Sequence, residues 1–326
     1  MLKHTGEIIK MTNECLSNEP KLTFKRLIYE KHDYLAKITI NRPDALNCFD
    51  YLTLKELAKA YEDVTYDDDI AVLVITGAGD RAFCTGADLK EQTEFTFKRP
   101  DNYYKWMYAF IEMHDRLRNI GKPTIARLNG MVVGGGNELN MACDLAIAAS
   151  HVTIRQVGAA RGSVASGGAT QWLPLIVGDR RAREILFTCE PISAQKALDW
   201  GLVNQVVPKE ELDEAVNILA QKLYQKLPGC LRYTKQQLNF WRDFSWGMTI
   251  GHARDWLTVH SNAYETKYGL KTFMDKSEID YAKVRQHHSS EETTWQNSLD
   301  NLNCPQCQSM IPDCFKFCGN CGVTLK

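Results

Sequence analysis

Residues 134–136 are three consecutive glycines, and they stand just before the ionisable side chain of Glu138. The apolar segment 123–128 predicts a short buried strand ahead of them, and residues 139–143 predict a helical turn or two after them. Glycines in such a place let the backbone approach a ligand closely and free its N–H groups to point outward. Those N–H groups suit an anion or a developing oxyanion, and Glu138 would be placed for acid–base chemistry on the bound group.

A second small-residue turn has a complementary design. The segment 81–90 follows residues 71–77, which predict another strand, and a backbone N–H near Gly86 and Ala87 could supply a second donor. A single glycine turn after a strand usually serves only packing. The two turns together, 49 residues apart between Gly86 and Gly135, predict one site with two main-chain donors.

In this order the two turns resemble those of the crotonase (enoyl-CoA hydratase/isomerase) superfamily. The resemblance covers roughly residues 22 to 275 and includes segments 40–47, 167–171, 192–197 and 200–203. It implies an α/β crotonase fold, with a ββα superhelical core and a C-terminal helical region that packs on neighbouring subunits. A homotrimer or homohexamer is therefore implied by the resemblance.

The resemblance also assigns roles to individual residues. The N–H groups of Ala87 and Gly135 would form an oxyanion hole for the thioester carbonyl oxygen of an acyl-CoA substrate. Glu138 would orient or deprotonate the attacking water, with a pKa raised by burial. The residues expected to contact coenzyme A are Arg42, Ala45, Leu46, Asp88 and Lys90.

Each of these assignments has a plainer alternative. Both glycine turns could serve packing alone, and Arg42 and Lys90 could be solvated surface residues. Glu138 could be a buried carboxylate at a helix start, satisfied by N–H groups. The match of so many segments in the right order favours the functional interpretation.

One position departs from the hydratases of this family. They carry a second glutamate twenty residues beyond the first, where this chain has Gly158. Because paired acid and base groups normally divide the two proton transfers, a simple two-glutamate hydration is in doubt. We expect the missing side chain to leave space for a bulkier acyl group or an extra water. The residues that could substitute for the glutamate are Asp144, His151, Arg161, Ser163, Ser166, Tyr103 and Tyr104.

The segment 157–186 looks most like one branch, the 6-oxocyclohex-1-ene-1-carbonyl-CoA hydrolases of anaerobic aromatic degradation. Those enzymes add water to a cyclic enone thioester and then open the ring by a retro-Claisen step. The resemblance thus implies an acyl-CoA hydratase/hydrolase that stabilises enolates. The alternatives are a generic enoyl-CoA hydratase or isomerase and, in another class, a catalytically silent acyl-CoA-binding protein whose tail docks a partner.

The last 23 residues predict a zinc ribbon. Two Cys-x-x-Cys pairs, Cys304 with Cys307 and Cys318 with Cys321, stand ten residues apart and supply four thiolates for a closed tetrahedral site. A structural Zn²⁺ would stabilise a segment with so little core, and Cys314 is not expected to be a ligand. The alternative is an unstructured tail with incidental thiols. The sequence does not identify a partner for the ribbon.

The composition narrows the setting in which these sites work. The 326 residues include 39 basic and 40 acidic side chains, so no general attraction to nucleic acid or to acidic membranes is expected. The chain has no signal-peptide-like start and no run of eighteen apolar residues, which favours a cytoplasmic protein. Six of the eleven cysteines are scattered without framework spacing, which favours reduced thiols.

These features predict an order of parts along the chain. We expect a flexible arm at residues 1–20, an α/β core at 21–208, a helical oligomerisation region at 209–285, a linker at 286–303 and the ribbon at 304–326. Within the core, a helix is predicted over residues 53–66, with Thr53 and Glu56 as its capping box.

Overall fold

The computed structural model describes residues 22–289, 301–312 and 316–325. The chain forms two compact units, Met1–Leu270 and Lys271–Lys326, and each is described by itself. The predicted arm at 1–20 lies outside the described residues.

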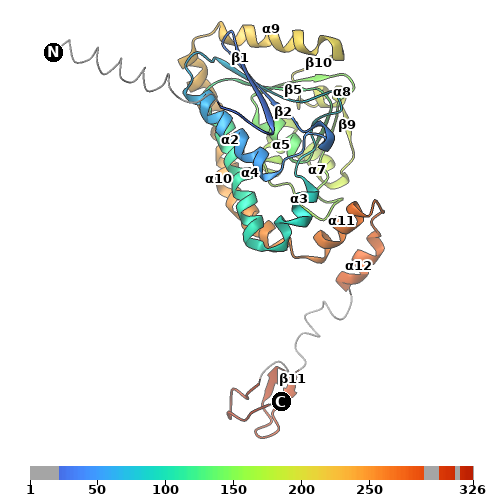
Figure 1. The fold of residues 1–326 in the computed structure, drawn as a ribbon. Coiled ribbons are helices and arrows are strands. Elements are labelled where there is room, and N and C mark those ends of the chain that lie inside the picture. The colour runs from blue at the N-terminus through green and yellow to red at the C-terminus, as the bar shows by residue number, and fades with distance from the viewer. Residues whose placement is uncertain (1–21, 290–300, 313–315, 326) are drawn as a thin grey trace, which may run out of the picture. The chain divides into compact units, whose positions relative to one another are not determined.

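The main sheet of the first unit has six strands in the order β1-β2-β3-β5-β7-β10 (Figure 1). The strands β1 and β2 pair antiparallel, and the other neighbours pair parallel. Every residue of β3 is buried, as expected of a parallel strand that is covered on both faces. The bounds are Leu27–His32 for β1, Leu35–Ile40 for β2, Val72–Gly77 for β3, Thr124–Leu128 for β5, Leu145–Ala149 for β7 and Gln205–Val207 for β10.

A second, smaller sheet positions the two glycine turns. Its strands are β4 (Ala82–Cys84), β6 (Met131–Val133), β8 (Thr153–Arg155) and β9 (Ile192–Ser193), in that order. The strands β4 and β6 pair parallel, and each ends directly before one of the turns. The pairing of these two strands therefore brings together turns that are far apart in the sequence. The strands predicted at residues 71–77 and 123–128 are β3 and β5, whereas β4 and β6 lie in segments where the sequence predicts only the turns.

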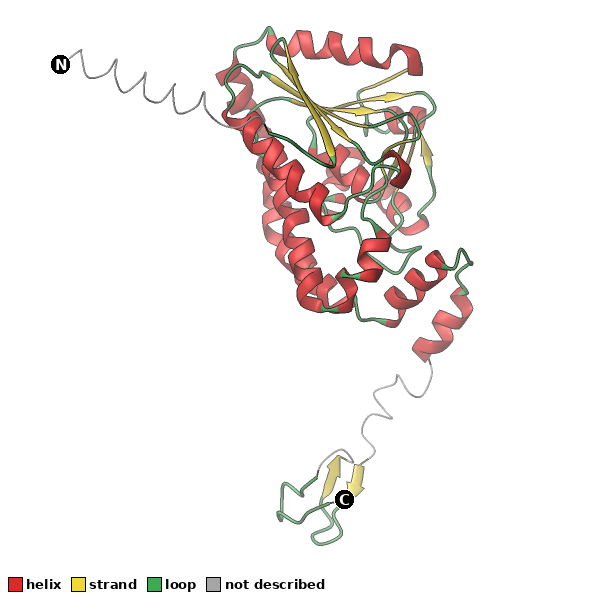
Figure 2. Cartoon of the chain, in the orientation of Figure 1, coloured by secondary structure: helices red, strands yellow, loops and turns green. Residues whose placement is uncertain are grey.

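Helices cover the sheets, and α2, α4 and α10 lie side by side along one flank (Figures 1 and 2). The core sits between these helices and the main sheet, where Leu54, Tyr61 and Ile75 are fully buried. The helical elements up to β10 are η1 (Pro43–Ala45), α2 (Tyr51–Tyr66), α3 (Leu89–Glu94), η2 (Thr96–Lys98), α4 (Pro100–Arg118), α5 (Gly135–Ala142), α6 (Ala169–Val177), α7 (Asp179–Thr188) and α8 (Ala194–Asp199).

The predicted capping box of α2 is wrong. The helix begins at Tyr51 because Asp50 is its N-cap, and the Asp50 carboxylate accepts a hydrogen bond from the Thr53 nitrogen at 2.7 Å. The Glu56 carboxylate instead accepts hydrogen bonds from the backbone nitrogens of Lys25 and Arg26, on the segment that leads into β1. A long-range contact thus replaces the local one that the sequence pattern favoured.

The region after β10 is helical, as predicted. It contains η3 (Lys209–Glu211), α9 (Leu212–Tyr224), α10 (Pro228–His260) and α11 (Tyr264–Met274), and Pro228 is the first residue of α10. In α10, Trp246 and Leu257 are buried, whereas Leu238, Trp241 and Phe244 on the same helix are more than half exposed. No helix within the described ranges is long and apolar enough to cross a membrane.

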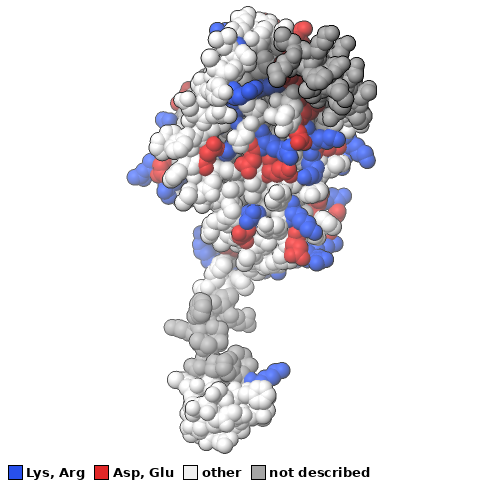
Figure 3. Space-filling model, turned by 90° about the vertical axis from the view of Figure 1, so that its left-hand side faces the viewer, with Lys and Arg blue, Asp and Glu red and all other residues white. Residues whose placement is uncertain are grey.

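The second unit contains α12 (Tyr281–Ser289) and a two-stranded antiparallel sheet, β11 (Asn301–Asn303) with β12 (Met310–Pro312). The predicted linker at 286–303 is therefore helical up to Ser289 and forms a strand from Asn301, and residues 290–300 lie outside the described part. None of the nine described cysteines forms a disulfide. On the face in Figure 3, acidic and basic side chains are interspersed across the first unit, in keeping with the nearly balanced charge.

Candidate active site

The two glycine turns lie in backbone contact. A Cβ atom at Gly86 would lie 2.8 Å from the nitrogen of Gly135, and Gly86 also has a φ of +81°, which L side chains rarely adopt. Gly86 is therefore required both by its conformation and by its neighbour. Gly135 is the first residue of α5, so its N–H points out of the helix start with no partner inside the helix.

The N–H groups of Ala87 and Gly135 make no hydrogen bond within the described part of the chain. The first turn is fixed by its neighbours: the Phe49 nitrogen donates to the Gly86 oxygen at 2.7 Å, and the Asp88 nitrogen donates to the Phe49 oxygen at 2.8 Å. This pairing leaves the intervening Ala87 N–H pointing away from Phe49. Two main-chain donors on touching turns can bind one anionic oxygen.

Arg42 and Asp88 form an ion pair at the base of the first turn. The Arg42 Nη2 lies 2.7 Å from an Asp88 oxygen, and its Nη1 donates to the Cys48 carbonyl oxygen at 2.7 Å. The second Asp88 oxygen caps α3 by accepting from the nitrogens of Lys90 and Glu91. Both side chains are mostly buried, and Asp88 directly follows Ala87, so this pair holds the first turn in place.

The other residues expected at coenzyme A surround the same turn. Ala45 ends η1, Leu46 accepts a hydrogen bond from the Thr85 hydroxyl at 3.2 Å through its carbonyl oxygen, and Lys90 is exposed at the start of α3. The segment therefore lies beside the candidate oxyanion hole. Because Arg42 is engaged with Asp88, the exposed Lys90 is the freer cation for a phosphate, and the contact of either with coenzyme A stays a prediction.

Glu138 lies in the first turn of α5, with only 3% of its surface exposed. Its Oε1 accepts hydrogen bonds from the nitrogens of Gly167 at 2.7 Å and Ala169 at 3.2 Å, where α6 begins. Burial raises the pKa of Glu138 to about 7, and the hydrogen bonds from the backbone of Gly167 and Ala169 partly offset that effect. A carboxyl group with this pKa can both accept and release a proton near neutral pH.

The expectation that Gly158 leaves space is wrong. A Cβ atom at Gly158 would lie 2.9 Å from the Ser163 carbonyl oxygen and 3.3 Å from the Cα of Val164. The backbone of the loop after Gly158 therefore fills the volume that a side chain would have occupied. No room for a larger acyl group arises at this position.

Two of the groups that could replace the second glutamate are committed elsewhere. An Asp144 oxygen accepts hydrogen bonds from the Lys235 ammonium at 2.8 Å and from the Thr124 nitrogen at 2.8 Å. The His151 Nε2 lies 3.2 Å from the Asn129 carbonyl oxygen, so it binds backbone outside the turns. These contacts give both side chains structural partners.

The remaining groups divide by their surroundings. The Ser166 hydroxyl contacts the sulfur of Met107 at 3.9 Å, and the Ser163 nitrogen donates to the Gly158 oxygen. Arg161 contributes its backbone to the packing against Gly269. In α4, Tyr103 is 5% exposed and lies in the protein interior, whereas its neighbour Tyr104 is 41% exposed and lies at the surface.

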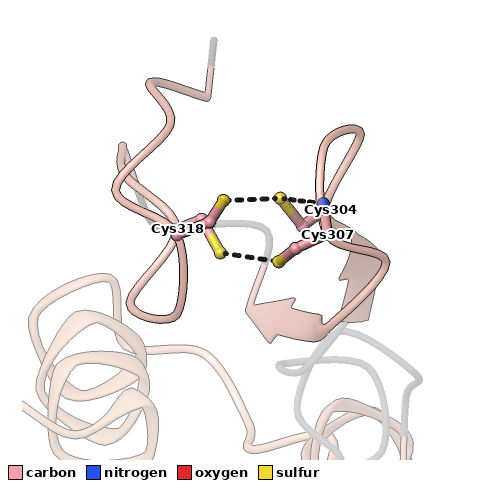
Figure 4. A group of neighbouring side chains, drawn as sticks. Cys304, Cys307 and Cys318 are labelled. Carbon is pink, nitrogen blue, oxygen red and sulfur yellow. Dashed lines mark hydrogen bonds between the residues drawn. The ribbon is translucent and has the colours of Figure 1, made fainter.

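The four cysteines predicted as zinc ligands come together in the second unit. Figure 4 shows the sulfur atoms of Cys304 and Cys307 facing that of Cys318. The Cys304–Cys321 and Cys307–Cys318 sulfur separations are 3.5 and 3.6 Å, and all four sulfurs lie within 4.8 Å of one another. Tetrahedral zinc with bonds of 2.3 Å requires separations of about 3.8 Å, so the four thiols fit this metal.

Comparison with known proteins identifies the family. The model of the enoyl-CoA hydratase/isomerase family matches residues 30–284. The chain belongs to this family. Its crotonase fold and its relation to acyl-CoA chemistry follow from that membership.

Solved structures from the family cover most of the chain. Pseudomonas aeruginosa DspI is 31% identical over 81% of this chain and 99% of that chain, with a TM-score of 0.66. The carnitinyl-CoA hydratase of Mycobacterium avium is 30% identical over 78% of this chain and 98% of that chain, with a TM-score of 0.68. An enoyl-CoA hydratase of Mycobacterium avium subsp. paratuberculosis shares the fold, with a TM-score of 0.72 at 23% identity, over 79% and 99% of the two chains.

Proposed function

We propose that the protein adds water to the double bond of an enoyl-CoA thioester. The observation that carries this proposal is the pair of N–H groups of Ala87 and Gly135, which lie on touching turns and donate no hydrogen bond within the described residues. They would donate to the thioester oxygen and stabilise the enolate that forms when water attacks. Loss of one such donor typically raises a barrier by about 3 to 4 kcal/mol.

Glu138 is the proposed base for the attacking water. Its pKa of about 7 leaves a large ionised fraction at neutral pH and still makes it basic enough to accept a proton from water in the transition state. Hydrogen bonds from Gly167 and Ala169 fix the carboxylate and leave its second oxygen to the reaction. Activity is expected to rise with pH through about 7, as Glu138 loses its proton.

The test measures how fast the Glu138→Gln variant hydrates crotonyl-CoA. The reaction is monitored by the decrease of the enoyl absorbance. We expect kcat to fall at least about 10²-fold, the lower end for a general base, while KM changes by less than about threefold. Glu91→Gln is the matched control, because Glu91 is a half-buried carboxylate that binds the Tyr51 nitrogen. A loss below about tenfold, or about 1.4 kcal/mol, would remove Glu138 from this role.

A narrower proposal concerns the acyl group. The resemblance of residues 157–186 supports 6-oxocyclohex-1-ene-1-carbonyl-CoA as the substrate, with water addition followed by ring opening, whereas the filled volume beside Gly158 gives no support for a bulky group. A kcat/KM for this thioester more than about tenfold above that for crotonyl-CoA would support the narrower activity. Binding of enoyl, dienoyl and cyclic oxo-enoyl thioesters without turnover would instead favour the acyl-CoA-binding alternative.

We also propose that Cys304, Cys307, Cys318 and Cys321 hold a structural Zn²⁺. Four thiolates fill every position of a tetrahedral ion and leave none for substrate, so the metal would stabilise the tail and take no part in hydration. Cys304, Ile311 and Cys318 are the buried core of this segment, which is too small to fold without further stabilisation.

A homotrimer or homohexamer is the proposed assembly. It is supported by the exposed aromatic side chains of α10, among them Tyr233, Phe240, Trp241 and Phe244, which are 59 to 67% exposed in the single chain. Exposed apolar patches of this kind mark protein interfaces. Light scattering of the full chain would give the mass of the assembly.

A further inference from the structure

Hydration moves two protons, and the proposed function accounts for only one of them. Glu138 takes a proton from water, but another proton must arrive at the α-carbon of the enolate. Gly158 offers no side chain for this step, and Asp144 and His151 are engaged elsewhere. The inference below rests on the proposed function and names the missing donor.

One face of α4 joins the candidate site to the side chain of Tyr103. Tyr103, Trp106 and Phe110 are spaced at i, i+3 and i+7, and all three are buried. Their rings form a continuous row, with centroids 6.4 Å apart for the first pair and 5.2 Å apart for the second.

Phe110 anchors this row at the site itself. A Cβ atom at Gly135 would lie 3.3 Å from the Phe110 ring, and a Cβ atom at Gly167 would lie 2.6 Å from both that ring and the Oε2 of Glu138. The face of α4 that carries Tyr103 therefore also packs against the second turn and the carboxylate.

The Tyr103 hydroxyl has no hydrogen-bond partner among the described residues. Its ring is buried and packs on Phe97 at 4.8 Å. The hydroxyl oxygen itself keeps some accessible surface, so it is free to donate a hydrogen bond to a ligand atom. Burial and, after it, the negative charge of Glu138 raise the pKa of Tyr103, which keeps the phenol protonated and couples it electrostatically to the carboxylate.

We propose that the Tyr103 hydroxyl donates the proton that the α-carbon of the enolate receives. As Glu138 removes a proton from water, the oxygen bonds to the β-carbon and the double-bond electrons move into the enolate. The enolate then forms a C–H bond with the Tyr103 proton, and the phenolate oxygen keeps the O–H electron pair. The proton on Glu138 returns to Tyr103, directly or through water, so one water is added and both groups are restored.

The test compares Tyr103→Phe with Tyr104→Phe in the full chain. Both variants lose one hydroxyl, but Tyr104 is exposed and packs beside Arg254, 5.0 Å from its ring. With crotonyl-CoA, Tyr103→Phe is expected to lower kcat at least about 10²-fold, with KM changed by less than about threefold, and Tyr104→Phe is expected to keep both. The thermal midpoint and the Kd for butyryl-CoA should be unchanged in both variants, which excludes a merely structural effect.

A second measurement isolates the α-carbon step. Exchange of the α-hydrogens of butyryl-CoA in D₂O, monitored by NMR, runs this step in both directions without water addition. Glu138 takes the Tyr103 proton, the phenolate removes an α-hydrogen to give the enolate, and a deuteron returns by the same route. Loss of exchange in Tyr103→Phe alone would support the inference. Equal exchange in Tyr103→Phe and the unaltered protein, or a larger loss in Ser166→Ala, would overturn it. An unaltered protein that exchanges the hydrogens but hydrates no enoyl thioester would overturn the proposed function and leave the assignment of Tyr103 standing, and one that does neither would overturn both.

Discussion

The paired turns of the first unit and the four-cysteine cluster of the second differ in what supplies their ligand atoms. In the turns, the candidate donors are main-chain N–H groups of Ala87 and Gly135, which follow two strands that pair in the small sheet. In the cluster, the donors are side-chain sulfurs within 18 residues of one another, from Cys304 to Cys321. The first site depends on the whole fold to position it, whereas the proposed zinc ion would stabilise the fold around the second.

Loss of the proposed zinc ion should unfold the four-cysteine cluster and leave the paired turns unchanged. Zinc contributes about 10 to 16 kcal/mol of apparent binding free energy to small domains of this kind, so Cys304→Ser is expected to lose the ion and the tail structure. Elemental analysis should fall from about one zinc per chain to none. Cys230→Ser, at an exposed cysteine of α10, is the control and should keep the metal. Turnover of crotonyl-CoA should stay the same in both variants, and a large loss in Cys304→Ser would mean that the tail supports the active site.

A substitution at Gly86 should test whether contact between the turns matters. Gly86 and Gly79 both have positive φ, +81° and +73°, but a Cβ atom would strike the Gly135 nitrogen only at Gly86 and would meet nothing within 4 Å at Gly79. Both alanine variants should lose about 1 to 2 kcal/mol of unfolding free energy from backbone strain. Only Gly86→Ala should also displace an oxyanion donor and lower kcat by about 10²-fold. Equal turnover in the two variants would contradict the proposed role of this contact.

As the pH rises and Glu138 loses its proton, activity should increase while the free energy of unfolding decreases. Its pKa rises from 4.5 to about 7 on folding, so the folded chain retains a proton that the unfolded chain has lost between those pH values. The free energy of unfolding therefore falls as the pH rises from 4.5 to 7, by at most about 3 kcal/mol, and the full penalty is present above 7. Glu138→Gln should thus be the more stable protein at pH 8 and no more stable at pH 4, as measured by urea unfolding.

The opposite order of stability would contradict a pKa of Glu138 raised by burial. If Glu138→Gln proves less stable than the unaltered chain at pH 8, then the hydrogen bonds from Gly167 and Ala169 stabilise the charge more than burial penalises it. Glu138 would then be a satisfied structural carboxylate, the alternative that its position at a helix start also allows.

The sequence could predict those elements of the fold that are determined by residues close together in the chain. The strands predicted at residues 71–77 and 123–128, the helical region after residue 209 and the cysteine cluster follow from local patterns, and the structure has all of them. The capping box failed because Glu56 finds partners some 30 residues away, at Lys25 and Arg26. A local rule cannot anticipate a competing partner of that kind.

The site shows the same division. The turns and Glu138 could be placed from glycine spacing and family resemblance, but the pairing of Arg42 with Asp88 spans 46 residues and had no local signal. The volume beside Gly158 is filled by the backbone at Ser163, which depends on how the following loop turns back. Tyr103 could be named only as one of seven candidates, because tertiary packing determines which side of α4 faces Glu138.

The two amides that donate to Glu138 also turn the start of α6 into a reporter. A hydrogen-bonded amide proton shifts in the NMR spectrum when its acceptor gains or loses charge, so the signals of Gly167 and Ala169 should record the ionisation of this one carboxyl group. Isotope labelling of glycine and alanine would then allow a spectroscopist to follow the ionisation of Glu138 in the resting protein, with no ligand added and no residue altered.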